Sequence, residues 1–117
     1  MKASELLSHY QEGVRQFGGQ HIVGSLAGEN LEGAVFNQCS FLVDFKGANL
    51  KGAQFLKGNI KSCDFADADL TNAKFEYMTI EKASFKGSKA DDVYFRENTI
   101  NGEYVSQEEF DTRVRYL

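Results

Sequence analysis

The residues that could perform acid–base or nucleophilic chemistry are few and lie far apart along the sequence. His9 and His21 are the two histidines, Ser88 has no histidine near it, and the paired acids are Asp91-Asp92 and Glu108-Glu109. Catalysis requires such groups to converge in one cleft with tuned protonation. No glycine-rich stretch is followed by the Lys-Ser/Thr pair of a phosphate-binding loop. We therefore predict no catalytic site, no cofactor and a chain that is not an enzyme.

A period of five residues indicates the kind of fold that must position these groups. From Phe45 to Val105 a large apolar residue returns at every fifth position, with Ala90 as the one small exception. Helices repeat every three or four residues and strands every second one, so five fits neither. A fixed internal repeat indicates a solenoid, in which each unit buries its apolar side against its neighbours. If four fives form one square coil, Phe stacks on Phe along two of its sides, at positions 45, 65, 85 and 55, 75, 95.

A small residue usually stands two places before each large one, as in Ala48, Ala68 and Ala73. Two inward residues of every five share a narrow interior, so one can be large only where the other is small. Cys39 and Cys63 occupy small inward positions on different columns. We interpret both as small core residues in preference to a disulfide or a metal pair.

Segments such as Ala48-Asn49-Leu50 and Ala68-Asp69-Leu70 repeat the pattern A-(D/N)-L-x-x. Over roughly residues 17–105 the chain therefore resembles the pentapeptide-repeat family. This resemblance implies an all-β solenoid, a right-handed quadrilateral β-helix with turns about 4.8 Å apart. The opening stretch around Glu5-Leu6-Leu7 resembles the short helix that begins many cyanobacterial members.

We predict a single domain over residues 1–117, with a short α-helix at each end. Residues 4–17 form an N-terminal capping helix that begins at Ser4 and is stopped by Gly18-Gly19. Residues 18–105 form a β-helix of about four to five coils. Two four-residue steps, from Ile22 to Leu26 and from Phe41 to Phe45, indicate one corner tightened in successive coils. An irregular loop over residues 20–30 is the alternative.

Residues 106–117 form the predicted C-terminal helix, with Ser106 and Glu109 as a capping box. Its apolar face is expected to close the end of the solenoid, with Phe110 turned inward above Ala90. Val114 and Leu117 then cover Phe95 and Ile100. The alternative is that the same face joins two chains, since this end of the family often dimerises. Both a monomer and a homodimer through the C-terminal end therefore remain open.

Acidic residues gather near the C-terminal end, where residues 91–111 hold seven acids against Arg96 alone. Quinolone-resistance members of the family imitate DNA towards gyrase with an acidic surface, so a DNA mimic acting on gyrase or topoisomerase is the alternative function. Lysines interrupt the middle coils, and our main prediction is a non-enzymatic scaffold that presents a surface to an unidentified protein partner. The candidate interaction residues are Asp91, Asp92, Glu97, Glu103, Phe110, Val114 and Leu117.

Composition limits the other partners and the location. The formal net charge is −4, which disfavours direct nucleic-acid binding. No apolar run is long enough to span a bilayer, so no membrane association is predicted. The N-terminal stretch lacks the apolar segment of a signal peptide, and the predicted location is cytoplasmic.

Overall fold

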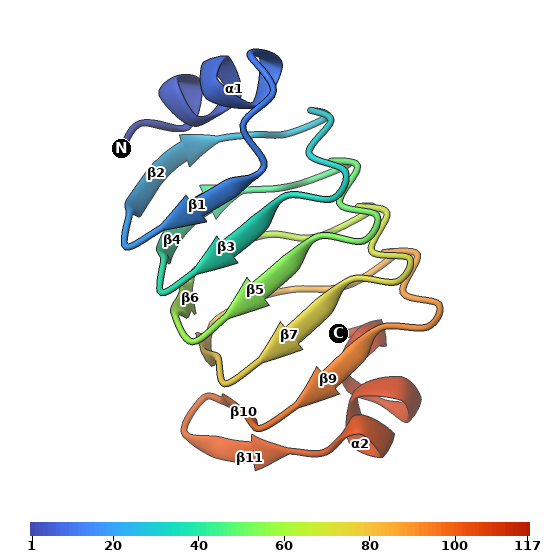
Figure 1. Ribbon diagram of the computed structural model, residues 1–117. Helices are drawn as coiled ribbons and strands as arrows, with labels where there is room; N and C mark the ends of the chain where they lie inside the picture. Colours follow the sequence, from blue (N-terminus) through green and yellow to red (C-terminus); the bar gives the residue numbers. More distant parts are fainter.

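The five-residue period folds as the predicted right-handed quadrilateral β-helix, a solenoid of about four turns with a short helix at each end (Figure 1). The structure is a computed structural model that describes all residues, 1–117. Its principal extents are 37 × 23 × 20 Å. The long dimension follows the stacking direction of the coils, so the two helices lie at opposite ends of the molecule.

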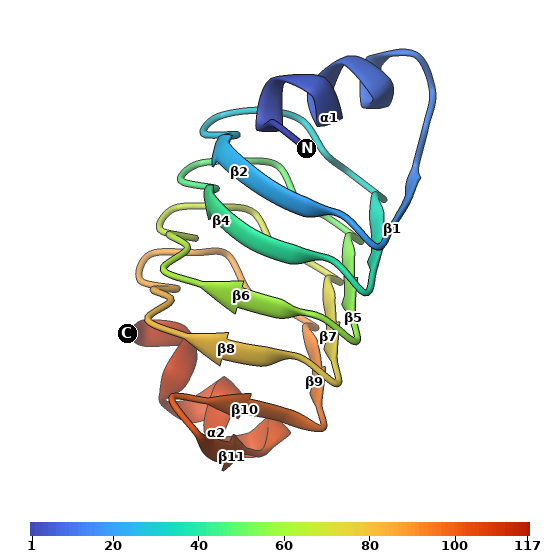
Figure 2. The same cartoon turned by 90° about the vertical axis from the view of Figure 1, so that its left-hand side faces the viewer.

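Two sides of each coil are short strands that stack into sheets. The five-stranded sheet is parallel throughout and consists of β1 (Gln16–Gly18), β3 (Val35–Asn37), β5 (Gln54–Leu56), β7 (Lys74–Glu76) and β9 (Tyr94–Arg96). The six-stranded sheet faces the viewer in Figure 2 and consists of β2 (His21–Ser25), β4 (Ser40–Asp44), β6 (Asn59–Lys61), β8 (Thr79–Glu81), β10 (Asn98–Ile100) and β11 (Glu103–Val105).

The other two sides of each coil are turns, and these carry the Asn and Asp of the repeat pattern. Asp64 Oδ1 accepts a hydrogen bond from the Ala66 N–H at 2.8 Å, and Asp69 Oδ1 accepts one from the Thr71 N–H at 3.0 Å. A short side chain with an acceptor stabilises such turns by bonding to the backbone two residues ahead. Burial opposes the ionisation of Asp69, but the hydrogen bonds from Thr71 outweigh it and lower the pKa of this carboxyl.

The core consists of stacked phenylalanine rings, as the 20-residue period predicts. The rings of Phe45 and Phe65 are stacked with centroids 5.0 Å apart, and those of Phe55 and Phe75 with centroids 4.8 Å apart. All ten phenylalanines are buried, with at most 5% of their surface exposed. The two Phe columns also meet edge to face, so the interior is filled with side chains along its length.

One column of inward positions departs from the small-residue rule. A Cβ atom on Gly58 would overlap the Cys39 carbonyl oxygen, so only glycine fits at this point, and the large Met78 occupies the corresponding position of the next coil. Asn98 continues the column and is fully buried. Its Oδ1 accepts from the Met78 N–H at 2.8 Å, and its Nδ2 donates to the Phe75 carbonyl at 2.8 Å. This buried polar residue was not predicted from the sequence.

The tightened corner is confirmed, and the loop alternative for residues 20–30 is wrong. Ile22 pairs with Phe41 and Phe41 with Ile60, both at a spacing of 19, whereas Ile60 pairs with Ile80 at a spacing of 20. In later coils the chain turns at this corner through Ser62, whose φ is 54°. The first two coils have one residue fewer at this corner, so β2 and β4 continue through it as strands of five residues.

The N-terminal helix is shorter than the predicted residues 4–17. α1 spans Ala3–Gln11, and its N-cap is Lys2 instead of Ser4. It ends because Gly13 adopts a φ of +103°, which lets the Val14 N–H bond to the His9 carbonyl at 3.0 Å. This is a glycine-based helix stop that precedes the expected Gly18-Gly19. Phe17 consequently belongs to β1, while α1 covers the first coil with its buried residue Leu6.

The C-terminal end differs from the prediction in two ways. The coil does not continue to residue 105, because Asn101 and Gly102 form a two-residue turn with φ values of 51° and 83°. Such a turn joins antiparallel strands, and β11 accordingly runs back along β10. The predicted helix over 106–117 is also divided. α2 spans Gln107–Thr112 and is followed by a 3-10 turn, η1 (Val114–Tyr116), because Arg113 leaves the helical conformation. The Ser106–Glu109 capping box is confirmed.

The C-terminal segment replaces the missing next coil. The Phe65 N–H bonds to the Ser84 carbonyl at 2.8 Å, and one coil later the Phe85 N–H bonds to the Leu117 carbonyl at 2.6 Å. The Gln107 side-chain amide accepts from the Phe95 N–H at 2.7 Å and donates to the Val93 carbonyl at 2.8 Å. These groups satisfy backbone donors and acceptors that would otherwise be left open at the end of the ladder.

Candidate functional site

The solenoid brings His21 and Ser40 together, a pair that was not predicted from the sequence. His21 Nδ1 lies 2.6 Å from Ser40 Oγ, because residues 19 apart are neighbours on β2 and β4. A nucleophile beside a base is one element of hydrolytic chemistry, which further requires donors for an oxyanion and an enclosed substrate. The pair lies on the open outer surface of the six-stranded sheet, next to Val23 and Asn59. We interpret it as a cross-strand hydrogen bond.

The two cysteines are buried free thiols inside the solenoid. Burial raises the pKa of Cys63 to about 11 and also raises that of Cys39. Reactive cysteines have lowered pKa values, so both thiols are poor nucleophiles at neutral pH. No group of three or more His, Cys, Asp or Glu side chains has the arrangement needed to hold a metal ion.

The raised pKa of Cys63 predicts a pH dependence of stability. Between the ordinary thiol pKa of 9.0 and the folded value of about 11, the unfolded chain has lost the thiol proton while the folded chain retains it. The free energy of unfolding should therefore fall by up to about 1.4 kcal/mol per pH unit as the pH rises through this window. Urea denaturation across this range should show a smaller fall for Cys63→Ala, and equal slopes for the two proteins would contradict the assignment.

The acidic residues predicted for the interaction surface do not form one face. Asp91 pairs with Arg115 at 3.5 Å, Asp92 and Glu97 lie at opposite ends of β9, and Glu103 lies on β11. Arg96 stands in the same coil between Asp92 and Glu97. These acids are therefore distributed around the last coil.

The apolar residues of the same prediction divide into two groups. Phe110 and Val114 are 0% and 5% exposed, because both pack into the core from the C-terminal cap. Their inclusion in an interaction surface was wrong. Leu117 keeps 59% of its surface exposed.

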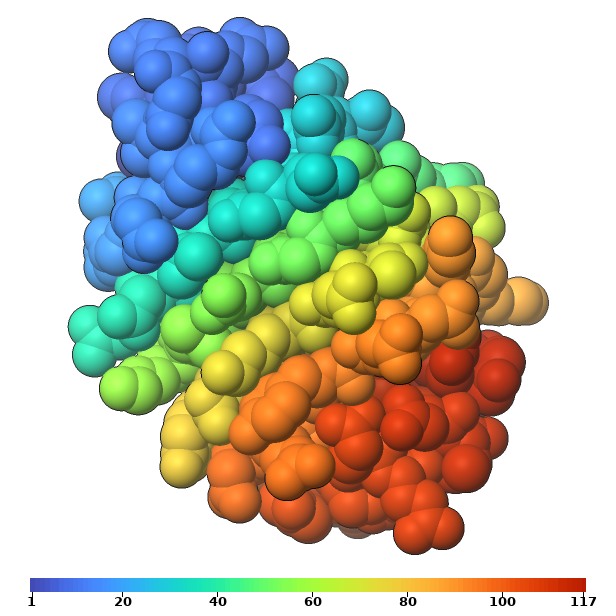
Figure 3. All heavy atoms as spheres, turned by 45° about the vertical axis from the view of Figure 1, so that its right-hand side comes forward, coloured from blue at the N-terminus to red at the C-terminus, as the bar shows by residue number.

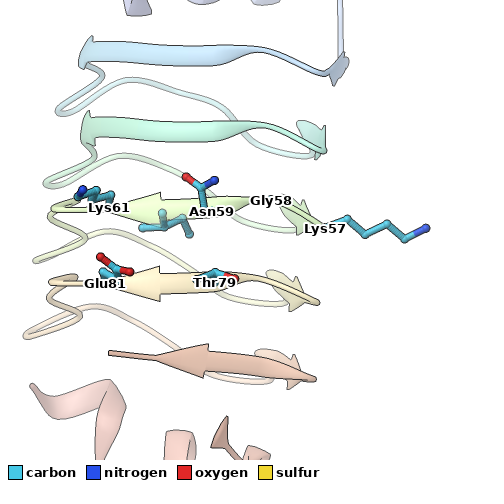
Figure 4. A pocket seen from close by; sticks show the side chains of 7 residues that line it. Lys57, Gly58, Asn59, Lys61, Thr79 and Glu81 are labelled. Carbon is cyan, nitrogen blue, oxygen red and sulfur yellow. The ribbon is translucent and has the colours of Figure 1, made fainter. Parts of the chain in front are cut away.

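A shallow hollow of about 490 Å³ lies on the six-stranded sheet (Figure 4). Its lining is almost entirely polar and comes from β6, β8 and the corner before β6. In the figure Lys57 points away from Lys61, Glu81 and the other labelled side chains. The charged groups do not converge on a common point, so the hollow has no arrangement that would fix a ligand.

The strands of both sheets in the first two coils carry almost no charged side chains, although the Met1 ammonium donates to the His21 carbonyl at 2.7 Å and Lys2 pairs with Val23 at the edge of β2. Residues 16–28 and 33–43 contain no Asp, Glu, Lys or Arg. These segments form β1, β2, β3 and nearly all of β4, which adjoin around one edge of the solenoid (Figures 1 and 2). Val23 and Leu42 are direct neighbours in the six-stranded sheet and are 42% and 44% exposed. We call this region the charge-free surface.

Charged residues are concentrated on the later coils instead. On the five-stranded sheet Tyr94 has Lys74 Nζ 4.9 Å and Arg96 Cζ 5.1 Å from its ring centroid, and its hydroxyl donates to Glu76 at 3.2 Å. The coils cross the surface in Figure 3 as parallel bands, with α2 and the C-terminal residues at one end. The two ends of the solenoid thus present different chemistry.

The repeat is also recognised by comparison with known families. Residues 44–87 and 63–97 match the model of pentapeptide repeats. Residues 44–97 of the chain thus consist of pentapeptide repeats. This agrees with the turn geometry, since the Asn and Asp of the repeat pattern make the side-chain-to-backbone bonds on the turn sides. No helix of this pentapeptide-repeat chain has the length and apolar character of a membrane span.

Solved structures of pentapeptide-repeat proteins are similar to this chain. HetL, involved in the regulation of heterocyst differentiation in the cyanobacterium Nostoc sp. strain PCC 7120, is 25% identical, with a TM-score of 0.51 over 78% of this chain. The match covers 48% of HetL, so the chain spans about half of the length of that relative. Rfr23 from the cyanobacterium Cyanothece 51142 is 12% identical, with a TM-score of 0.49 over 88% of this chain and 99% of Rfr23.

QnrB1, a plasmid-mediated fluoroquinolone resistance protein, is 15% identical, with a TM-score of 0.40 over 71% of this chain and 64% of QnrB1. No curated protein sequence matches the chain.

Proposed function

We propose that this pentapeptide-repeat protein is a non-enzymatic scaffold that binds a protein partner through the charge-free surface. The observation that carries the proposal is the uncharged pair of segments, 16–28 and 33–43, with Val23 and Leu42 exposed side by side on the six-stranded sheet. The cores of protein interfaces are depleted in charged residues, since each charge buried there loses its hydration. A short stack of rigid strands holds this surface in a fixed shape, which lowers the entropy cost of binding.

A substitution that adds charge to this surface tests the proposal. Tagged wild-type protein and Leu42→Glu are used to capture partners from the native host, and captured proteins are quantified by mass spectrometry. Leu42→Glu should reduce the recovery of the specific partner about tenfold, because it places a carboxylate at the centre of an apolar contact.

Thr79→Glu is the matched control, since Thr79 is exposed on the same sheet but lies outside the charge-free surface. It should retain the partner, and both variants should melt at the wild-type temperature. Equal recovery by the wild-type protein and both variants would contradict the assignment of this surface.

DNA mimicry towards gyrase is the alternative function. A mimic of DNA requires a continuous acidic surface, whereas the acids here surround the last coil, and Asp91 is paired with Arg115. We therefore favour the scaffold, and specific inhibition of gyrase supercoiling by the purified protein would favour the alternative. The cytoplasmic location and the choice between monomer and homodimer stay predictions.

A further inference from the structure

A groove of about 430 Å³ lies at the C-terminal end, between the β10–β11 hairpin and the residues that follow α2. We call it the β11 groove. Apolar atoms of Ile100, Val105 and Val114 contribute to its lining, and Tyr104 and Leu117 stand beside them with 60% and 59% of their surfaces exposed. Exposed aromatic and aliphatic side chains next to a concave surface are typical of a binding groove.

The backbone beside this groove has one free strand edge. The Thr99 N–H bonds to the Met78 carbonyl at 3.1 Å, so the polar backbone groups of Thr99 point towards β8. In the antiparallel pairing of β10 with β11, Thr99 lies opposite Tyr104. Because the polar backbone groups of Thr99 point towards β8, these two residues form no backbone hydrogen bonds with each other. The N–H and C=O of Tyr104 consequently point away from β10, at the open edge of the six-stranded sheet. Such an edge pairs readily with an added extended segment.

The charged residues that line the groove are Glu103, Glu109 and Arg113, so its lining has a small negative charge. Arg113 is paired with Glu109 at 3.4 Å, and Arg115 is paired with Asp91 at 3.5 Å. Glu103 and Glu108 take part in none of the ion pairs of the structure. Glu103 belongs to the lining of the groove. An occupant with positive side chains would therefore complement this end of the molecule.

We propose that the β11 groove binds an extended segment of a partner protein in which an apolar residue is flanked by Lys or Arg. The apolar side chain enters the groove beside Tyr104 and Leu117. The backbone of the segment exchanges hydrogen bonds with the N–H and C=O of Tyr104, and a flanking cation lies against Glu103. This site is independent of the charge-free surface, which lies at the other end of the solenoid.

The test uses the full chain and a fluorescein-labelled peptide of alternating lysine and valine, with its glutamate counterpart as the charge control. Fluorescence anisotropy should show binding of the lysine peptide and at least about tenfold weaker binding of the glutamate peptide. Glu103→Lys should weaken binding of the lysine peptide about tenfold. Glu81→Lys, the same substitution at an exposed acid on β8, should change it less than about twofold.

The hydrogen-exchange rate of the Tyr104 amide, measured by NMR, would not change if the peptide were held by charge attraction alone. Exchange should slow when the lysine peptide binds, because this N–H gains an acceptor. The proposal is overturned by failure of the lysine peptide to bind, by an equal effect of Glu103→Lys and Glu81→Lys, or by unchanged Tyr104 exchange. A wild-type dimer in light scattering, with Tyr104 protected before peptide is added, would assign the groove to a second copy of this chain instead.

Discussion

Replacing Phe75 with alanine should lower the free energy of unfolding by about 3–5 kcal/mol. Phe75 is fully buried, and its ring is stacked on Phe55 with centroids 4.8 Å apart and an interplanar angle of 6°. It also meets Phe65 and Phe85 edge to face at 5.9 and 6.0 Å. The coils above and below are held by strand hydrogen bonds, so the walls cannot close around the lost ring and a cavity remains.

Chemical denaturation with urea measures this loss, and Lys74→Ala is the control. Lys74 is the adjacent residue on the same strand, but its side chain points outward and is 36% exposed. Its ion pair with Glu76, at 3.8 Å, is a surface contact. We expect a loss of about 0.5 kcal/mol or less for Lys74→Ala. Comparable losses for the two variants would show that the assignment of inward and outward positions is incorrect.

Phe110→Asp should destabilise the protein at least as much as Phe75→Ala. The Phe110 ring is fully buried, stacked on Phe95 with centroids 4.5 Å apart and edge-on to Phe85 at 5.4 Å. The substitution removes these contacts, and it also places a carboxylate in an apolar site, where an unpaired charge is strongly disfavoured. The cap that carries Gln107 and Leu117 should then detach, which leaves the last coil with unsatisfied backbone groups.

Thermal melting and light scattering together distinguish a cap from a dimer contact. If Phe110 caps its own chain, the wild-type protein is monomeric and Phe110→Asp melts at a clearly lower temperature. Glu108→Ala, on the exposed side of α2, should melt close to the wild-type temperature. A wild-type dimer that Phe110→Asp converts to a monomer with little change in melting temperature would contradict the capping role.

The regular part of this fold could be predicted from the sequence because its determinants are local and repeated. From Phe45 onward the coils present the same alternation of large and small inward residues, apart from Ala90 and the column of Gly58, Met78 and Asn98, so the register of one coil applies to the next. Even the tightened corner was detectable, since the two four-residue steps lie 19 residues apart and therefore stack. The buried Asn98 was not predicted, because nothing in the sequence shows that two backbone groups of neighbouring residues are placed to form hydrogen bonds with its amide.

The candidate surfaces were predicted less well. The charge-free surface was not predicted, because its two uncharged segments are separate in the sequence and become neighbours only when β1 to β4 stack. The acidic residues at positions 91, 92, 97 and 103 are close in sequence, yet the square coil distributes them around its perimeter. The pairing of His21 with Ser40 likewise depends on the length of the first coil.

The sequence by itself determined the solenoid, the Phe columns and the presence of a helical segment at each end, because a fixed period imposes the same steric requirements on every coil. Only the tertiary structure decided how each end closes. The Asn101-Gly102 dipeptide is typical of a hairpin turn. However, the twelve preceding sides of the solenoid all follow the five-residue period, which predicts that the coil continues past it. The division of the C-terminal helix at Arg113 depends on contacts with residues far earlier in the chain, such as Phe85 with Leu117, 32 positions apart, and Asp91 with Arg115, 24 positions apart. An end coil has no further copy of the repeat against which to pack, so its conformation, and with it the β11 groove, depends on these long-range contacts.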